Sequence, residues 1–252
     1  MAVAATSSAG ALGIAFHRIV PDDPRVRRVS RNPLESDRRI PGLCSRNMRF
    51  LRPDDKVRAL RHYARIADDY QRRVEHGPLL RALRRRERRI VLELAQLAPG
   101  LSLADVGCGN GFYALEARRR GVRVCAIDAV PEMLAAMSGA VDDIRLRDVE
   151  DLRGIGTFDR VVCAGVLDFV IDPDLAFANV CRLVASGGRL VVLAPCAGVG
   201  GWLYRAEKRL SGLRVNLFTS AWFASRSDRN GLRLAEVRRP LPGNMAVAAI
   251  RR

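Results

Sequence analysis

Residues 102–128 read SLADVGCGNGFYALEARRRGVRVCAID. The apolar run at 103–106 has the length of one buried strand. Gly107, Gly109 and Gly111 follow it at every second position. Three glycines so spaced predict a tight turn whose backbone a ligand can approach closely, because no Cβ stands in the way.

A helix and a second strand are expected after this turn. The helix covers Phe112–Arg120, and Gly121 suits its end. The run Val122–Ile127 is a second apolar strand, and the carboxylate of Asp128 follows it directly. The succession of strand, glycine turn, helix, strand and acid predicts a nucleotide-binding unit in which Asp128 accepts hydrogen bonds from ribose hydroxyls.

The glycine spacing distinguishes between classes of nucleotide. A dinucleotide-binding loop reads G-x-G-x-x-G, which makes an NAD-dependent dehydrogenase a poor fit. This loop reads G-x-G-x-G, with Asp105 two residues before the first glycine. The combination resembles the first motif of the class I S-adenosylmethionine-dependent methyltransferases.

This resemblance implies an α/β, Rossmann-like fold. Its sheet has seven strands, mostly parallel with a C-terminal antiparallel hairpin, and helices cover both faces. The implied cofactor is S-adenosyl-L-methionine, and no metal is expected. In the first half of the fold the implied cofactor-binding residues are Asp105, Gly107, Cys108, Gly109, Asp128 and Ala129.

Later stretches extend the resemblance to about residues 54–252. A short strand at 144–146 precedes Asp148 and Val149, which match the family's adenine-binding acid and its neighbour; an ordinary acidic loop is the alternative. The run 158–170 resembles the fourth strand and its following turn, and the carbonyls around Cys163 are expected at the cofactor. The fifth strand is expected at 187–195, and a closing hairpin at 232–250.

The turn after the fourth strand departs from the family pattern. Related enzymes have a turn of the Leu-Glu-His-Val type, and here it reads Leu167-Asp168-Phe169-Val170. Phenylalanine in place of histidine removes one candidate general base. The catalytic residue is therefore unassigned, with His62, His76 and Asp168 as candidates.

Two helices are expected ahead of the first strand, at 54–75 and 79–97, as an N-terminal cap. Tyr63 and Tyr70 lie on the first, in a Tyr-x-x-x-Ala-x-x-Tyr pattern that resembles the helix covering the cofactor in many small-molecule methyltransferases. Ordinary packing tyrosines are the alternative reading. Residues 196–224 occupy the place of a substrate-side insertion, and their aromatic residues could line an acceptor pocket or pack a helical lid. The aromatic and apolar side chains of this group are Trp202, Tyr204, Leu217, Phe218, Trp222 and Phe223.

The 252-residue chain suits one domain with an extension. Residues 1–47, broken by prolines, predict a disordered or loosely packed extension before a domain at 48–252. No apolar run is long enough to span a membrane, and the start is a poor signal peptide. Six scattered cysteines predict reduced thiols and a cytoplasmic protein.

The net charge of +16 has two readings. A basic protein can bind nucleic acid, but residues 1–100 hold 22 basic and 11 acidic residues, so most of the excess precedes the glycine loop. All basic residues except Lys56 and Lys208 are arginines. We expect a methyltransferase that acts on oxygen or nitrogen of a small organic molecule. The alternatives are an RNA or other nucleic-acid methyltransferase and a catalytically silent binding protein of the same fold.

Overall fold

The computed structural model describes residues 51–70, 72 and 76–252. The predicted extension at 1–47, the proposed domain start at Met48 and the thiol of Cys44 lie outside this part of the chain.

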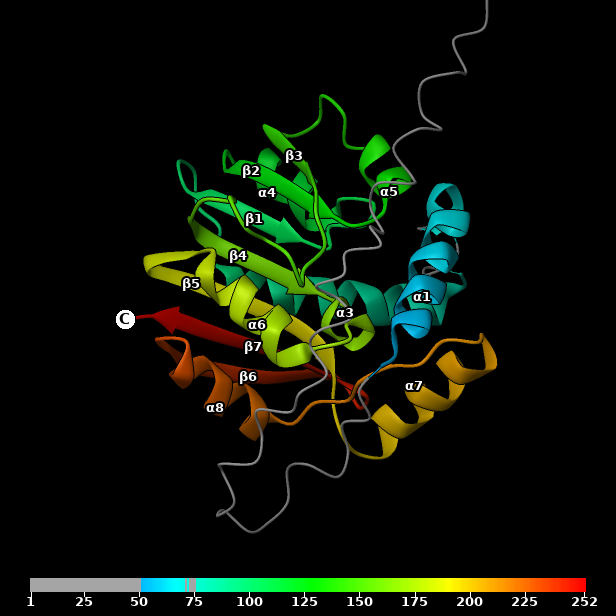
Figure 1. Cartoon of the computed structure of the whole chain (residues 1–252). Helices are drawn as coiled ribbons and strands as arrows, with labels where there is room; N and C mark the ends of the chain where they lie inside the picture. Colours follow the sequence, from blue (N-terminus) through cyan, green and yellow to red (C-terminus); the bar gives the residue numbers. More distant parts are fainter. Residues whose placement is uncertain (1–50, 71, 73–75) are drawn as a thin grey trace, which may run out of the picture. The chain divides into compact units, whose positions relative to one another are not determined.

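Seven described strands form one mostly parallel sheet in the order β3-β2-β1-β4-β5-β7-β6 (Figure 1). Strands β1 to β5 pair in parallel, β7 is antiparallel to β5, and β6 is antiparallel to β7. The predicted fold class is confirmed. The strand bounds are Ser102–Val106 (β1), Arg123–Asp128 (β2), Asp143–Leu146 (β3), Phe158–Ala164 (β4), Val184–Pro195 (β5), Leu232–Leu241 (β6) and Asn244–Arg251 (β7).

Helices cover both faces of the sheet (Figure 1). On one face α3 packs against β5, β6 and β7, and α4 against β1 and β2; on the other, α6 and α8 pack against β5, β6 and β7. The helix bounds are Pro53–Ile66 (α1), Pro78–Ala95 (α3), Phe112–Arg119 (α4), Pro131–Ala135 (α5), Pro173–Arg182 (α6), Val199–Leu210 (α7) and Ser220–Arg229 (α8), with 3-10 turns at Ala67–Asp69 (η2) and Leu167–Phe169 (η3).

The central strands are apolar on both sides because both faces are covered. Along β4, Val161 and Cys163 point into the core under α6 and α8, whereas Val162 points into the core under α3 and α4. This alternation follows from the two-residue repeat of a strand.

The strand order places a crevice at the carboxyl ends of the parallel strands, between β1 and β4. The chain runs outward from β1 through β2 to β3, and then returns to place β4 on the other side of β1. At such a switch point the loops after neighbouring strands separate, and ligands bind outside the carboxyl ends of the strands. The glycine turn lies at this end of the sheet, directly after β1.

Two helical expectations need correction. The helix predicted over 54–75 is interrupted: α1 ends at Ile66, the 3-10 turn η2 follows, and Tyr70 and Arg72 are helical again, while residues 71 and 73–75 lie outside the described part of the chain. The predicted aromatic group at 196–224 is divided: Phe218, Trp222 and Phe223 are buried in the core beside Phe177, whereas Trp202 is half-exposed. Within the described residues no helix has the length and apolar character needed to cross a membrane.

Candidate functional site

Backbone conformation and backbone hydrogen bonds hold the glycine turn in place. Gly107, Gly109 and Gly111 have φ values of +67°, +52° and +79°, which side chains disfavour. The N–H groups of Gly107 and Cys108 both donate to the carbonyl of Ile127, at 2.7 and 3.0 Å. A Cβ on Gly107 would come within 2.0 Å of the Val166 side chain, so glycine is required for the close packing of this turn.

Asp128 joins the end of β2 to the glycine turn. One carboxylate oxygen accepts from the N–H of Gly109 at 2.8 Å, and the other from the N–H of Val130 at 2.9 Å. Burial raises the pKa of Asp128, and these backbone donors oppose the rise. The carboxylate is thus fixed at the cleft with acceptor capacity remaining on each oxygen.

The cleft beside this turn is lined by eight of the predicted cofactor-binding residues. They are Tyr63, Tyr70, Gly107, Gly109, Asp128, Ala129, Asp148 and Val149. Their neighbours in the wall include Lys56, Met133 and Phe169.

The other three predicted residues lie elsewhere. Asp105 is buried beneath the turn, where it accepts from the N–H of Ala114 at 3.0 Å and holds the start of α4. Burial raises the pKa of Asp105 to about 7, and that hydrogen bond opposes the rise. The side chain of Cys163 lies within the core of the sheet, and the next two residues, Ala164 and Gly165, line the cleft, where carbonyls around Cys163 are expected. Cys108 lines a second, adjoining cavity.

This second cavity lies on the other side of the glycine turn and shares Tyr70, Gly107 and Gly109 with the cleft. Its far wall comes from α3. There Arg84 donates to the buried carboxylate of Glu87 at 2.7 Å. Arg88 lies over the ring of Phe112 at 4.0 Å. The cavity therefore carries both a cationic and an anionic wall.

The helix α1 and the turn η2 cover the cleft. The ring of Tyr63 meets Tyr70 and Phe169 edge-on, with centroids 6.0 and 5.3 Å apart. Burial raises the pKa of both tyrosines, so both are neutral phenols near neutral pH. The ammonium of Lys56 pairs with Asp148 at 2.6 Å and also with Glu150, which connects α1 to the loop after β3.

Asp168 is buried in η3 beside the cleft residue Phe169. One of its oxygens accepts from the hydroxyl of Tyr204 on α7 at 2.9 Å, and within the described residues the other has no hydrogen-bond partner. Burial raises the pKa of Asp168 to about 6, and the Tyr204 hydrogen bond opposes the rise. The Asp168 carbonyl also accepts from the N–H of buried Asn216 at 2.9 Å.

The two histidine candidates are placed differently. His62 lies on α1 with its ring edge-on to Tyr63, 5.5 Å away, and His76 is exposed ahead of α3. Neither lines the cleft or the second cavity.

Sequence reasoning missed Lys56, Arg84 and Glu87, and it placed Tyr204 in the substrate-side group without connecting it to Asp168. One signal was available for Lys56: it is one of only two lysines in an arginine-rich chain. The other, Lys208, lies 5.3 Å from the ring of Tyr204.

Comparison with known proteins identifies the fold. Residues 104–192 match a family model described as a methyltransferase domain. Over these residues the chain is similar to a methyltransferase domain. This match agrees with the methyltransferase resemblance of the glycine turn, and one solved structure of the same fold, magnesium protoporphyrin IX methyltransferase, holds bound SAM.

Curated relatives match the central part of this methyltransferase domain. The ubiquinone biosynthesis O-methyltransferase of Xanthomonas axonopodis pv. citri (strain 306) is 37% identical over 105 residues, which are 38% of this chain and 44% of that protein. That of Xanthomonas campestris pv. campestris (strain B100) is 40% identical over 101 residues, 36% of this chain and 42% of that protein. The chain spans less than half the length of these relatives.

Solved structures share the methyltransferase fold over a larger part of the chain. Magnesium protoporphyrin IX methyltransferase from Synechocystis PCC 6803 with bound SAH has a TM-score of 0.63 at 20% identity, covering 79% of this chain and 100% of that one. The 1,6-didemethyltoxoflavin-N1-methyltransferase of Burkholderia thailandensis has a TM-score of 0.59 at 16% identity, covering 81% and 92%.

Proposed function

We propose that this chain is an S-adenosylmethionine-dependent methyltransferase that methylates an oxygen or nitrogen atom of a small organic molecule. The observation that carries the proposal is the carboxylate of Asp128, fixed by two backbone N–H groups at the point where β2 meets the glycine turn. Oxygen is the favoured atom, because the curated relatives are named as O-methyltransferases. A nucleic-acid acceptor is the alternative that the basic N-terminal region suggests; nine of the 22 basic residues in 1–100 precede residue 51 and lie outside the described part of the chain.

The residues present fit S-adenosylmethionine. Asp128 offers acceptors for two ribose hydroxyls, and Asp148 with Val149 stands where an adenine edge needs an acceptor and a backbone donor. A Cβ on Gly109 would meet only the ring of Tyr70, at 3.9 Å, so the turn leaves open space on its cleft side. In the second cavity the guanidinium of Arg84 and the carboxylate of Glu87 suit the charged ends of an amino acid.

When bound, the cofactor supplies an electrophilic methyl group on a positively charged sulfur. The chain contributes alignment and the exclusion of water, which are the main requirements of a displacement with a good leaving group. Tyr63, Tyr70 and Phe169 cover the cleft with aromatic surface. Their neutral side chains exclude water without introducing a competing nucleophile.

Asp168 is the best placed of the three proton-accepting candidates. A hydroxyl acceptor loses its proton when its oxygen gains the methyl group, and a nearby base lowers the barrier to this step. The Tyr204 hydroxyl, bonded to Asp168, can accept the substrate proton as it passes its own to the carboxylate. A carboxylate with a pKa of about 6 is ionised at neutral pH and can receive that proton.

The cytoplasm is the proposed location. All five described cysteines are unpaired and buried, which suits a reducing compartment.

Calorimetric titration with S-adenosylhomocysteine, with NAD as the control ligand, tests the cofactor assignment. Binding of S-adenosylhomocysteine alone is expected. In Asp128→Asn, an amide replaces an acceptor oxygen, and we expect roughly a hundredfold loss of affinity, since a hydrogen bond to a charged group contributes about 1.5–3 kcal/mol. Asp174→Asn, on the exposed end of α6, is the matched control. Normal affinity in a folded Asp128→Asn protein would overturn the ribose assignment.

A further inference from the structure

Large apolar side chains are exposed mainly in two places on the described part of the chain. Seven are well exposed, and six of them lie at the start of α3 or on α7. These six are Leu79 (71%), Leu80 (49%), Val199 (81%), Trp202 (51%), Leu203 (68%) and Leu210 (91%). The seventh, Leu175, lies on α6.

The α7 side chains share one face of their helix. Val199, Trp202, Leu203 and Leu210 follow the three- and four-residue spacing of a helical stripe. The opposite face is directed inward, because Tyr204 bonds Asp168 and Gly201 is buried. A Cβ on Gly201 would come 1.8 Å from the carbonyl oxygen of Cys196. The inward contacts therefore fix the rotation of α7 and leave its most apolar side facing outward.

The apolar positions are surrounded by positive charge. The stretch 78–86 contains four basic residues and no acid, and the stretch 199–214 contains four basic residues and one acid, Glu207. Arg81, Arg85 and Arg209 are exposed among them.

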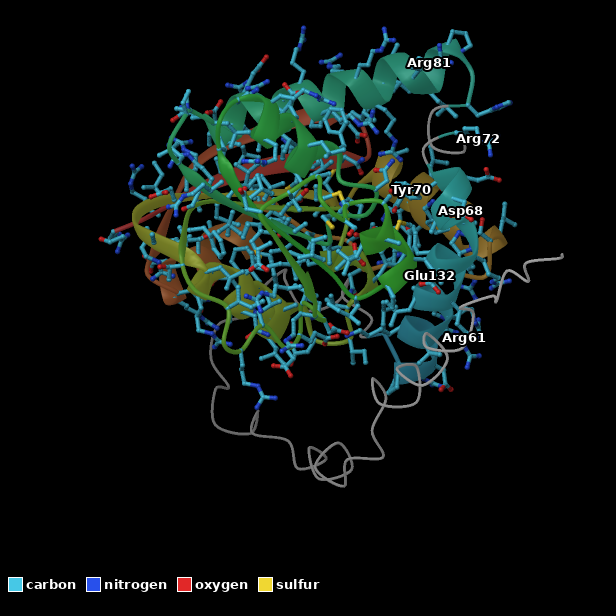
Figure 2. All side chains as sticks on the ribbon, turned by 90° about the horizontal axis from the view of Figure 1, so that it is seen from above. Arg61, Asp68, Tyr70, Arg72, Arg81 and Glu132 are labelled. Carbon is cyan, nitrogen blue, oxygen red and sulfur yellow. The ribbon has the colours of Figure 1, made fainter. Side chains whose placement is uncertain are left out.

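The two segments meet at the same side of the domain. The hydroxyl of Tyr204 on α7 reaches Asp168 beside the cleft, and Arg84 of α3 lines the second cavity. Both views place α1, the first turn of α3 and α7 on the side toward which the parallel strands point, and Figure 2 shows Arg61, Arg72 and Arg81 along this side. The exposed apolar positions therefore lie on the same side of the domain as the cleft.

We propose that this side of the domain, α7 with the start of α3, docks on an anionic phospholipid bilayer. Amphipathic helices that lie in a membrane interface combine Trp and Leu on one face with a basic rim, and basic residues are attracted to anionic headgroups. Both features are present here: α7 has Trp202 and Leu203 on its exposed face, and basic residues of α7 and the start of α3 surround them. Docking would place the cleft entrance at the lipid surface, where an apolar acceptor could enter directly. The inference is independent of the identity of the methyl donor.

Vesicle binding by the full-length protein tests this proposal. We expect it to sediment with vesicles that mix phosphatidylcholine and phosphatidylglycerol, more weakly with phosphatidylcholine alone, and less in high salt. The double variant Trp202→Ser, Leu203→Ser should lose roughly tenfold or more in partitioning, because two large apolar side chains no longer leave water. Leu175→Ser, the matched control outside the patch, should bind as well as the unchanged protein.

Trp202 provides a second readout. The only other tryptophan, Trp222, is buried in the core. In Trp222→Phe the emission reports on Trp202 alone, and anionic vesicles should shift it to the blue. If this variant does not fold, sedimentation of the unchanged chain decides.

Three outcomes would overturn the proposal. They are equal partitioning of the double variant and the control, no binding to either vesicle, and a lipid-free dimer that the double variant abolishes, which would make a second copy of the chain the occupant. Calorimetry with S-adenosylhomocysteine on each variant separates the two proposals. Lost vesicle binding with retained nucleotide binding overturns only the docking surface, and the reverse overturns only the proposed activity.

Discussion

The two walls of the cleft are constructed differently. The strand-end wall consists of the glycine turn, Asp128 and the loop after β3, and its contacts are mostly between side-chain oxygens and nearby backbone N–H groups. The helical wall consists of α1 and the turn η2, with α7 behind it through the Tyr204–Asp168 hydrogen bond, and its contacts join long side chains from distant parts of the chain. Under the proposed function, the first wall would hold the cofactor and the second would face the acceptor.

The largest expected effect is in the strand-end wall. Gly107→Ala places a Cβ 2.0 Å from the branched side chain of Val166 in a φ of +67°. Val166 has little rotamer freedom, so the turn must open. We expect S-adenosylhomocysteine affinity to fall by at least roughly a hundredfold, and the free energy of unfolding to fall by about 1–3 kcal/mol. Calorimetry and urea denaturation measure the two.

Gly154→Ala is the control for backbone strain alone. Its φ is +75°, and no atom lies within 4 Å of the added Cβ. It should lose about 1 kcal/mol of stability and keep normal affinity. Equal loss of affinity in both variants would mean that the close approach to Val166 is unimportant.

The two walls can also be compared by the pH dependence of folding stability, because a buried carboxyl group lies beneath each wall. The pKa of Asp105 under the strand-end wall is raised to about 7, and that of Asp168 under the helical wall to about 6. Between the unfolded pKa near 3.8 and these values the folded chain binds more protons than the unfolded chain. Each carboxyl therefore contributes stability below pH about 4 that is lost as pH rises.

Folding stability of the unchanged chain should fall by on the order of 4 kcal/mol between about pH 4 and 7 because of Asp105, and Asp105→Asn should abolish this fall because an amide does not titrate. Asp168→Asn should abolish a smaller fall in folding stability, which ends near pH 6 because the pKa of Asp168 is raised less than that of Asp105. The measurement is the free energy of unfolding of each variant against wild type across this range. A difference from wild type that is the same at every pH would show that neither carboxyl carries the shift.

A smaller effect is expected where α7 meets the sheet. Gly201→Ala should displace α7, because the added Cβ meets the carbonyl oxygen of Cys196 at 1.8 Å. We expect about 1–3 kcal/mol of lost stability and little change in S-adenosylhomocysteine affinity, since no α7 residue lines the cleft. Gly156→Ala, where the Cβ meets nothing within 4 Å, is the control. An affinity loss as large as that of Gly107→Ala would contradict the separation of the walls.

The sequence predicts the strand-end wall because its parts are local. Asp128 is the last residue of β2, and Asp148 follows β3 by two residues, so placing the strands also places these carboxylates at the cleft. The helical wall depends on contacts between distant residues. Tyr204 and Asp168 are 36 residues apart, and Lys56 and Glu150 are 94 apart. No spacing rule connects such pairs.

The same reasoning explains why the aromatic group predicted at 196–224 is wrong. Proximity in sequence predicts one group, but the start of α8 places Trp222 and Phe223 in the core, whereas α7 places Trp202 on the surface. The motif position of Asp105 predicts a cofactor-binding residue, and in the structure its side chain accepts a hydrogen bond from the first turn of α4 beneath the glycine turn.

The smallest expected effect concerns an ion-pair group that joins the two walls. Lys56 of α1 pairs with Asp148 and Glu150, and all three side chains are at most one-third exposed. Lys56→Ala leaves two carboxylates without their shared cation and frees α1 to move from the cleft. We expect roughly fivefold weaker S-adenosylhomocysteine binding, about 1 kcal/mol, in line with partly exposed ion pairs.

Arg153→Ala breaks an exposed pair with Asp151 away from the cleft and should change affinity less than about twofold. The difference between the variants should shrink in high salt, because exposed charges are screened. Tighter binding by Lys56→Ala would reverse the interpretation: Lys56 would then compete with adenine for Asp148, and the helical wall would oppose the cofactor that it covers.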